Sequence, residues 1–75
     1  MKQITQETRA AQIVAANIDR QKRLHGTKYE TLAKVINVSK GTLSNRMNHP
    51  ETFTLFEIFA LARFFKVDVS EIIGG

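Results

Sequence analysis

The strongest constraint on the fold is a break inside residues 31–47, TLAKVINVSKGTLSNRM. The segment begins with apolar residues at helical spacing, is interrupted at Asn37-Val38-Ser39, and continues as a polar, partly basic stretch. Asn tolerates the left-handed backbone conformation at a helix end, and Ser is a favourable N-cap for the next helix. The pattern therefore predicts two short helices, at about 28–36 and about 40–48, that cross at a tight turn.

The positions of the apolar residues predict which side of this pair of helices faces the core and which faces outward. The inner side is expected to hold Leu32, Ala33, Ile36, Val38, Leu43 and Met47. The outer side, over the first two turns of the second helix, then holds Lys40, Gly41, Ser44 and Asn45. This arrangement is a helix-turn-helix, a unit whose second helix lies in the major groove in many DNA-binding proteins.

The other helices follow from their apolar period and their end signals. Residues 6–24 carry a stripe near the 3.6-residue period, with either Gln21 or Leu24 as its last inward position. His49-Pro50 ends the helix at 40–48, because the residue before proline avoids the helical conformation. An apolar helix is expected at 55–65, and a short last helix after Asp68 that ends at Gly74.

Two segments have the form of a capping box, in which Thr and a Glu three residues later bond each other's backbone N–H. These are Thr27 with Glu30 and Thr54 with Glu57, at the expected starts of the helices near 28 and 55. No segment alternates like a strand, and hairpin dipeptides such as Asn-Gly are absent. The sequence therefore predicts an all-α fold, a compact bundle of four to five short helices.

Length and composition limit what this bundle can be. We expect residues 1–75 to form one domain with a small core, and residues 1–5 are the candidate for a disordered start. The absence of cysteine excludes disulfides, thiol catalysis and thiolate zinc sites. No apolar run reaches the roughly 20 residues of a membrane span, and the N-terminus lacks a hydrophobic signal core. We therefore expect a cytoplasmic protein without a membrane partner.

The net charge of +4 is concentrated in the middle of the chain. Residues 20–46 hold seven Lys and Arg against Glu30 alone, which gives +6, whereas residues 1–19 sum to zero and residues 47–75 to −2. A basic segment between neutral and acidic ends fits a polyanionic partner. A solvated lysine-rich surface has the same composition, so charge alone leaves both interpretations open.

Residues 14–73 resemble the Cro/C1-type helix-turn-helix domains, the lambda repressor-like (XRE) family of phage and bacterial regulators. The resemblance is carried by Ile18, Leu32-Ala33, Val38 and Leu43 at the family's spacing, and by residues 62–67 followed by Ile72-Ile73. Four positions depart from the family, and one of them is Arg46, which takes a place that is often apolar in relatives. Asn37 stands where Gly is usual and Tyr29 where Gln is frequent. Met47 replaces a Glu that many members pair with a helix-one cation, here Lys22.

The resemblance implies a sequence-specific regulator of double-stranded DNA: a phage-like repressor, commonly a homodimer, in the cytoplasm of a bacterium or a phage-infected host. Residues 39–48 would be the recognition helix in the major groove. The candidates for contact with base edges are Lys40, Gly41, Ser44 and Asn45. The candidates for contact with phosphates are Thr27, Lys28, Tyr29, Ser39, Thr42 and Arg46.

Other interpretations compete with this one. The same residues could be an ordinary polar helix face, and the fold could serve as a protein-interaction module, antitoxin-like or anti-repressor, with little direct DNA reading. The five Phe residues could form a stacking platform for single strands. We expect most of them in the core, with one of Phe56, Phe59 or Phe64 exposed as a dimer surface.

No pattern points to catalysis or to a bound group. His25 and His49 lie apart without the spacing of metal ligands. No Ser/His/Asp arrangement, glycine-rich phosphate loop or catalytic carboxylate pair is present in the sequence. We therefore expect no enzymatic activity, no metal, no cofactor and no small-molecule ligand.

Overall fold

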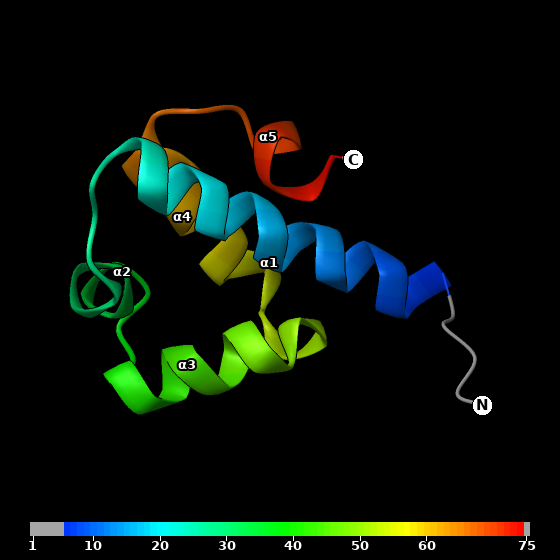
Figure 1. Cartoon of the computed structure of the whole chain (residues 1–75), viewed down its shortest axis with the longest axis horizontal. Coiled ribbons are helices and arrows are strands. Elements are labelled where there is room, and N and C mark those ends of the chain that lie inside the picture. The colour runs from blue at the N-terminus through cyan, green and yellow to red at the C-terminus, as the bar shows by residue number, and fades with distance from the viewer. Residues whose placement is uncertain (1–5, 75) are drawn as a thin grey trace.

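The structure is a computed structural model that describes residues 6–74. Its elements are α1 (Gln6–Leu24), α2 (Tyr29–Val35), α3 (Lys40–Asn48), the 3-10 turn η1 (Pro50–Thr52), α4 (Leu55–Phe65) and α5 (Ser70–Ile73) (Figure 1). The all-α class is confirmed, and the described residues include no strand. The expected disorder of residues 1–5 falls outside the described range.

The helices surround one core to which each of them contributes. The largest fully buried side chains are Ile18 of α1, Leu32 of α2, Leu43 of α3, Leu61 and Phe65 of α4, and Ile72 of α5. Helix α1 contacts α5 and η1, whereas α2 contacts α3 and α4. Helix α3 consequently lies along one edge of the molecule, on the side of α1 opposite α5 (Figure 1).

The last residue of α1 that faces the core is Gln21 and not Leu24. Gln21 is buried, whereas Leu24 is 71% exposed, because the chain turns away at Gly26, which has a φ of 62°. The Asn17 side-chain amide ties α1 to the other end of the chain. Its Nδ2 atom donates to the carbonyl oxygens of Ile72 and Gly74, at 2.8 and 2.7 Å.

The break between α2 and α3 has the predicted form. Asn37 adopts the left-handed conformation, with a φ of 61°. The Asn37 N–H donates to the Lys34 carbonyl at 3.1 Å, and the Val38 N–H donates to the Ala33 carbonyl at 2.9 Å. These two bonds form a Schellman motif, in which Val38 packs against the core beneath the turn.

The capping box expected at Thr27 is wrong. Helix α2 begins at Tyr29, and its N-cap, Lys28, makes no side-chain capping bond. The Thr27 N–H instead donates to the Lys22 carbonyl at 3.0 Å, which closes the end of α1. Because Thr27 belongs to the end of one helix, it does not cap the next, and Glu30 is left to pair with Lys40.

The capping box at Thr54 is confirmed in both directions. The Glu57 N–H donates to the Thr54 hydroxyl at 3.1 Å, and the Thr54 N–H donates to Glu57 Oε1 at 2.9 Å. The short last helix after Asp68 is present, but it begins at Ser70 and its N-cap, Val69, makes no side-chain capping bond, while Asp68 Oδ1 accepts from the Ser70 N–H at 2.9 Å. The hydrogen bonds from Ser70 lower the pKa of the Asp68 carboxyl.

The expectation that most Phe residues lie in the core is wrong. Phe53 and Phe65 are buried, whereas Phe56, Phe59 and Phe64 are exposed, Phe56 to 76%. Helix α4 is apolar on nearly all sides, and the side that holds Ala60, Leu61 and Phe65 is the one buried against the other helices. The opposite side remains open to solvent.

Candidate nucleic-acid interface

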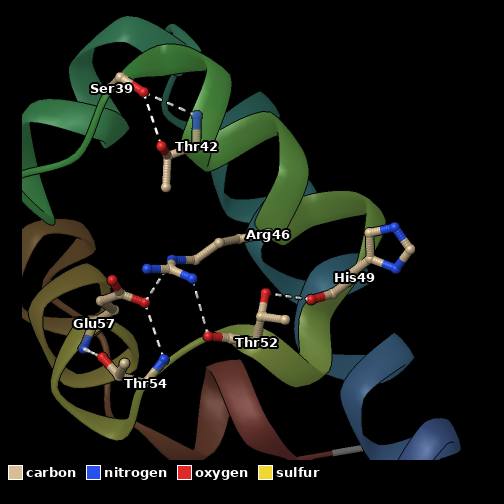
Figure 2. Close-up of polar contacts among 7 residues, drawn as sticks. All are labelled: Ser39, Thr42, Arg46, His49, Thr52, Thr54 and Glu57. Atoms are coloured by element: carbon tan, nitrogen blue, oxygen red, sulfur yellow. Dashed lines mark hydrogen bonds and ion pairs between the residues drawn. The ribbon is translucent and has the colours of Figure 1, made fainter.

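The N-terminal end of α3 is built by a serine cap. Ser39 has extended backbone angles, and its Oγ accepts from the Thr42 N–H at 3.0 Å. The Ser39 hydroxyl in turn donates to Thr42 Oγ1 at 2.9 Å (Figure 2). The Thr42 backbone and side chain thus both take part in the capped end of α3.

Helix α3 has one apolar side and one polar side, as the sequence predicts. Leu43 is fully buried, and the half-buried Met47 packs against the same core one turn later. The four residues expected on the outer side are all exposed: Lys40, Gly41, Ser44 and Asn45. The fold therefore presents an ammonium, a hydroxyl and a carboxamide along one exposed helix face.

Gly41 is not required by the fold. A Cβ atom at this position would meet only Ser39 Oγ, at 3.9 Å, which is an ordinary van der Waals contact. Gly41 also lies in the first turn of α3, and its φ is not among the positive values of the chain. The free protein has room for a side chain here, so nothing within the described residues explains the glycine.

Lys40 is loosely paired across the motif. Its Nζ atom lies 3.7 Å from Glu30 Oε1, and both side chains are about two-thirds exposed, at 65% and 67%. Exposed pairs of this kind contribute about 0–1 kcal/mol, because water competes for both charges. Lys40 can therefore exchange Glu30 for another acceptor at little cost.

Tyr29 at the start of α2 is held in place by its neighbours in α1. Lys22 Nζ lies 4.5 Å from the centroid of the Tyr29 ring, and the phenol oxygen lies 3.5 Å from Asp19 Oδ1. Burial raises the pKa of the Tyr29 phenol, and the charge and hydrogen bond of Asp19 raise it further. Thr27 is half-buried and Lys28 exposed beside it.

Arg46 differs from the other candidates of α3 because it points into the protein. Its Nε atom lies 3.0 Å from Glu57 Oε1, and its Nη1 donates to the Thr52 carbonyl at 3.2 Å (Figure 2). The side chain is only 23% exposed. The expected phosphate contact assumed an outward guanidinium, whereas the structure gives this guanidinium partners in η1 and α4.

The basic middle of the chain is partly neutralised by the fold. Four of its seven cations lie within 4.0 Å of a carboxylate, in the pairs Arg20–Glu71, Arg23–Asp19, Lys40–Glu30 and Arg46–Glu57. Within residues 6–74, the other three, Lys22, Lys28 and Lys34, have no ion-pair partner. The sequence indicated the excess charge but not these pairs, because their acids lie outside the segment except for Glu30.

A helix-turn-helix with a capped second helix and an exposed polar face defines a DNA-binding domain. The family model described as helix-turn-helix matches residues 20–72, and the chain belongs to this Cro/C1-type family. No curated protein and no solved structure matches the chain significantly. The family consists of DNA-binding regulators rather than enzymes, which makes this protein a DNA-binding helix-turn-helix regulator.

Across residues 6–74, no helix combines the length and hydropathy of a membrane span. The same residues contain no group of three or more His, Cys, Asp or Glu placed to hold a metal ion. The ring of His25 lies against Phe65, with centroids 5.2 Å apart, and His49 lies 3.7 Å from Glu51.

Proposed function

We propose that the protein is a sequence-specific transcriptional repressor that reads double-stranded DNA with residues 39–48 in the major groove. One observation carries the proposal: α3 exposes Lys40, Gly41, Ser44 and Asn45 while Leu43 fixes its other side in the core. Lys can donate to O6 and N7 of guanine, and Asn can bond adenine with both ends of its amide. These side chains would read base edges.

Phosphate contacts would orient α3 on the duplex. Ser39, Thr42 and the free amides at the start of α3 form one end of the contact surface. Thr27, Lys28 and Tyr29 at the start of α2 form the other end, as the resemblance implies. Such contacts add affinity and set the register, whereas base contacts determine the sequence that is bound.

The regulator would act by occupying an operator and excluding polymerase. Residues 1–75 would be one domain, in a phage or prophage protein that works in the bacterial cytoplasm. A two-fold dimer would place two α3 helices in successive major grooves, with half-sites about 34 Å apart. The open side of α4 offers an apolar surface for this contact, formed by Leu55, Phe56 and Phe59 and called the α4 apolar surface below.

Selection of bound sites from randomised duplexes tests the proposal. We expect a preferred site, on which Lys40→Ala and Asn45→Ala each lose about 1–3 kcal/mol of binding free energy and relax one base position. Lys66→Ala is the matched control for Lys40→Ala, because it removes the same charge from an exposed position outside α3. Equal weakening on selected and scrambled duplexes would show that Lys40 and Asn45 touch phosphate only.

A second function is favoured by one observation, the exposed α4 apolar surface. A protein-interaction module, antitoxin-like or anti-repressor, would use this surface and show no preferred duplex. The salt dependence of DNA binding distinguishes the two functions. Binding to DNA weakens with a log–log slope of roughly −0.9 for each phosphate contact, so a flat salt response would favour the interaction module.

A further inference from the structure

One side chain, Arg46, connects the proposed recognition helix to the rest of the molecule at two points. Arg46 leaves α3 and reaches Glu57 in the first turn of α4 and the Thr52 carbonyl in η1 (Figure 2). Glu57 Oε1 also accepts from the Thr54 N–H, so the same carboxylate completes the capping box and pairs with the Arg46 guanidinium. The side chains of Arg46 in α3 and Glu57 in α4 thus meet next to η1, the segment that connects the two helices.

The burial of this contact distinguishes it from the other ion pairs. Glu57 is 6% exposed, whereas the acids paired with Arg20, Arg23 and Lys40 are exposed to 40% or more. Arg46 Nε is fully covered, and although it lies 3.0 Å from the carboxylate it lacks the alignment of a hydrogen bond. The attraction is therefore chiefly between charges, in surroundings where water screens them little.

Arg46 directly follows two of the outward candidates, Ser44 and Asn45. Successive residues of an α-helix are rotated by about 100°, so the direction of one side chain fixes that of its neighbours. With Arg46 held against Glu57, Asn45 is fixed on the exposed side. Leu43 anchors the first turn of α3, and Arg46 anchors the second.

We propose that the Arg46–Glu57 pair positions α3 for base reading and that Arg46 itself makes no phosphate contact. The inference rests on the proposed function, since it concerns the reading of a preferred duplex. Arg46 and Glu57 act through Ser44 and Asn45, whose placement on the base edges depends on the angle between α3 and α4. Both are positioning residues rather than residues of the contact surface.

Glu57→Gln tests the proposal because positioning and net charge predict opposite changes in DNA affinity. Glutamine keeps the size of the side chain and a carbonyl for the Thr54 N–H, so the cap persists. The substitution makes the protein more positive, which by itself strengthens DNA binding. We expect instead a loss of roughly tenfold or more on the duplex selected by the wild-type protein, the cost of one good base contact. Binding to a scrambled duplex should not weaken.

Glu51→Gln is the matched control. Glu51 lies in η1, is exposed and pairs only with His49, so its substitution removes the same charge without touching α3. We expect this variant to bind the selected duplex as tightly as the wild-type protein or more tightly. Equal or tighter binding by Glu57→Gln as well would overturn the proposal.

Substitution of Arg46 separates positioning from phosphate contact. Arg46→Met should weaken binding to the selected duplex while the salt slope stays unchanged, because no phosphate partner is lost. A slope smaller by roughly 0.9, with equal weakening on scrambled DNA, would show a phosphate contact and overturn the proposal. The double variant Arg46→Met with Glu57→Gln should recover part of the lost affinity, because it leaves no buried charge without a partner.

Amide NMR spectra of each variant establish that it is folded at the temperature of measurement. If Glu57→Gln or Arg46→Met does not fold, the Arg46→Lys variant tests the proposal instead. Lysine retains the charge but cannot reach Glu57 and Thr52 together as the guanidinium does, so selected-site affinity should fall. Wild-type affinity in Arg46→Lys would overturn the proposal. A wild-type protein that selects no duplex would instead overturn the proposed function.

Discussion

At the scale of single residues, the role of each side chain of α3 follows from what it touches. Leu43 touches the core, Arg46 touches Glu57, and Thr42 touches the cap at Ser39. Gly41 touches nothing that would exclude a methyl group. A glycine in a helix is unfavourable relative to alanine by up to about 1 kcal/mol, and less in the first turn. Its presence on the exposed face fits a close approach of DNA to the backbone.

Gly41→Ala should therefore separate folding from binding. We expect the free energy of unfolding to stay equal or to rise by up to about 1 kcal/mol, because alanine restricts the unfolded chain and fits the open space. Affinity for the selected duplex should fall about tenfold or more, since the methyl group would stand between α3 and a base pair. Chemical denaturation and a binding titration measure the two effects. Unchanged affinity would show that Gly41 is only a tolerated first-turn glycine.

At the scale of helical elements, three helix ends use one backbone motif. The chain passes through the left-handed conformation at Gly26, Asn37 and Lys66, and at each the same pair of hydrogen bonds returns to the preceding helix. The sequence predicted the left-handed residue at Asn37, and both Gly and Asn tolerate the positive φ that the motif requires. Lys66 carries no such signal, because its conformation is imposed by the burial of Phe65 before it and by Val67, which packs against the core after it.

Lys66→Gly should stabilise the protein. Lys66 has a φ of 58°, a conformation that is unfavourable by roughly 1–2 kcal/mol for residues with a Cβ. We expect a free energy of unfolding about 1 kcal/mol higher in denaturant titrations, without a change in affinity for the selected duplex. Lys66→Ala, which loses the same charge but keeps the Cβ, should show no such gain. A gain of equal size in Lys66→Ala would point to charge rather than conformation.

The end of α1, both ends of α3 and the start of α4 were predictable because a glycine, a serine cap, a proline and a capping box lie there. The start of α2 was not, because the Thr27 backbone already completes the end of α1. The contact between Arg46 and Glu57 could not be predicted from the sequence either. The two residues lie in different helices, and helical periodicity relates only residues within one helix. Glu57 was visible in the sequence as a capping residue alone.

At the scale of the whole molecule, two features of the described residues bear on assembly, the exposed polar face of α3 and the exposed α4 apolar surface. The first was predictable from the sequence, since burial of Leu43 determines which side of α3 is outward. The second was not, because α4 is apolar on nearly every side and only tertiary packing decides which of its Phe residues are covered. Together these regions would allow a dimer on DNA.

Phe56→Glu should disrupt such a dimer. Phe56 is 76% exposed, so its substitution should change the free energy of unfolding of the monomer by no more than about 0.5 kcal/mol. In analytical ultracentrifugation we expect the wild-type protein to form dimers, at least on the selected duplex, and Phe56→Glu to remain monomeric and bind more weakly. Leu24→Glu is the control, since Leu24 is 71% exposed but lies at the end of α1. An equal effect of both substitutions would contradict the assignment of this surface.

Tyr29 is the only tyrosine of the chain, which has no tryptophan. Its ring, with Lys22 beside it and Asp19 near its oxygen, lies at the start of α2, one of the two places where phosphates are expected. Ultraviolet emission from the native protein therefore originates chiefly at a single known position. Unfolding and complex formation can both be followed optically without a dye or a tag.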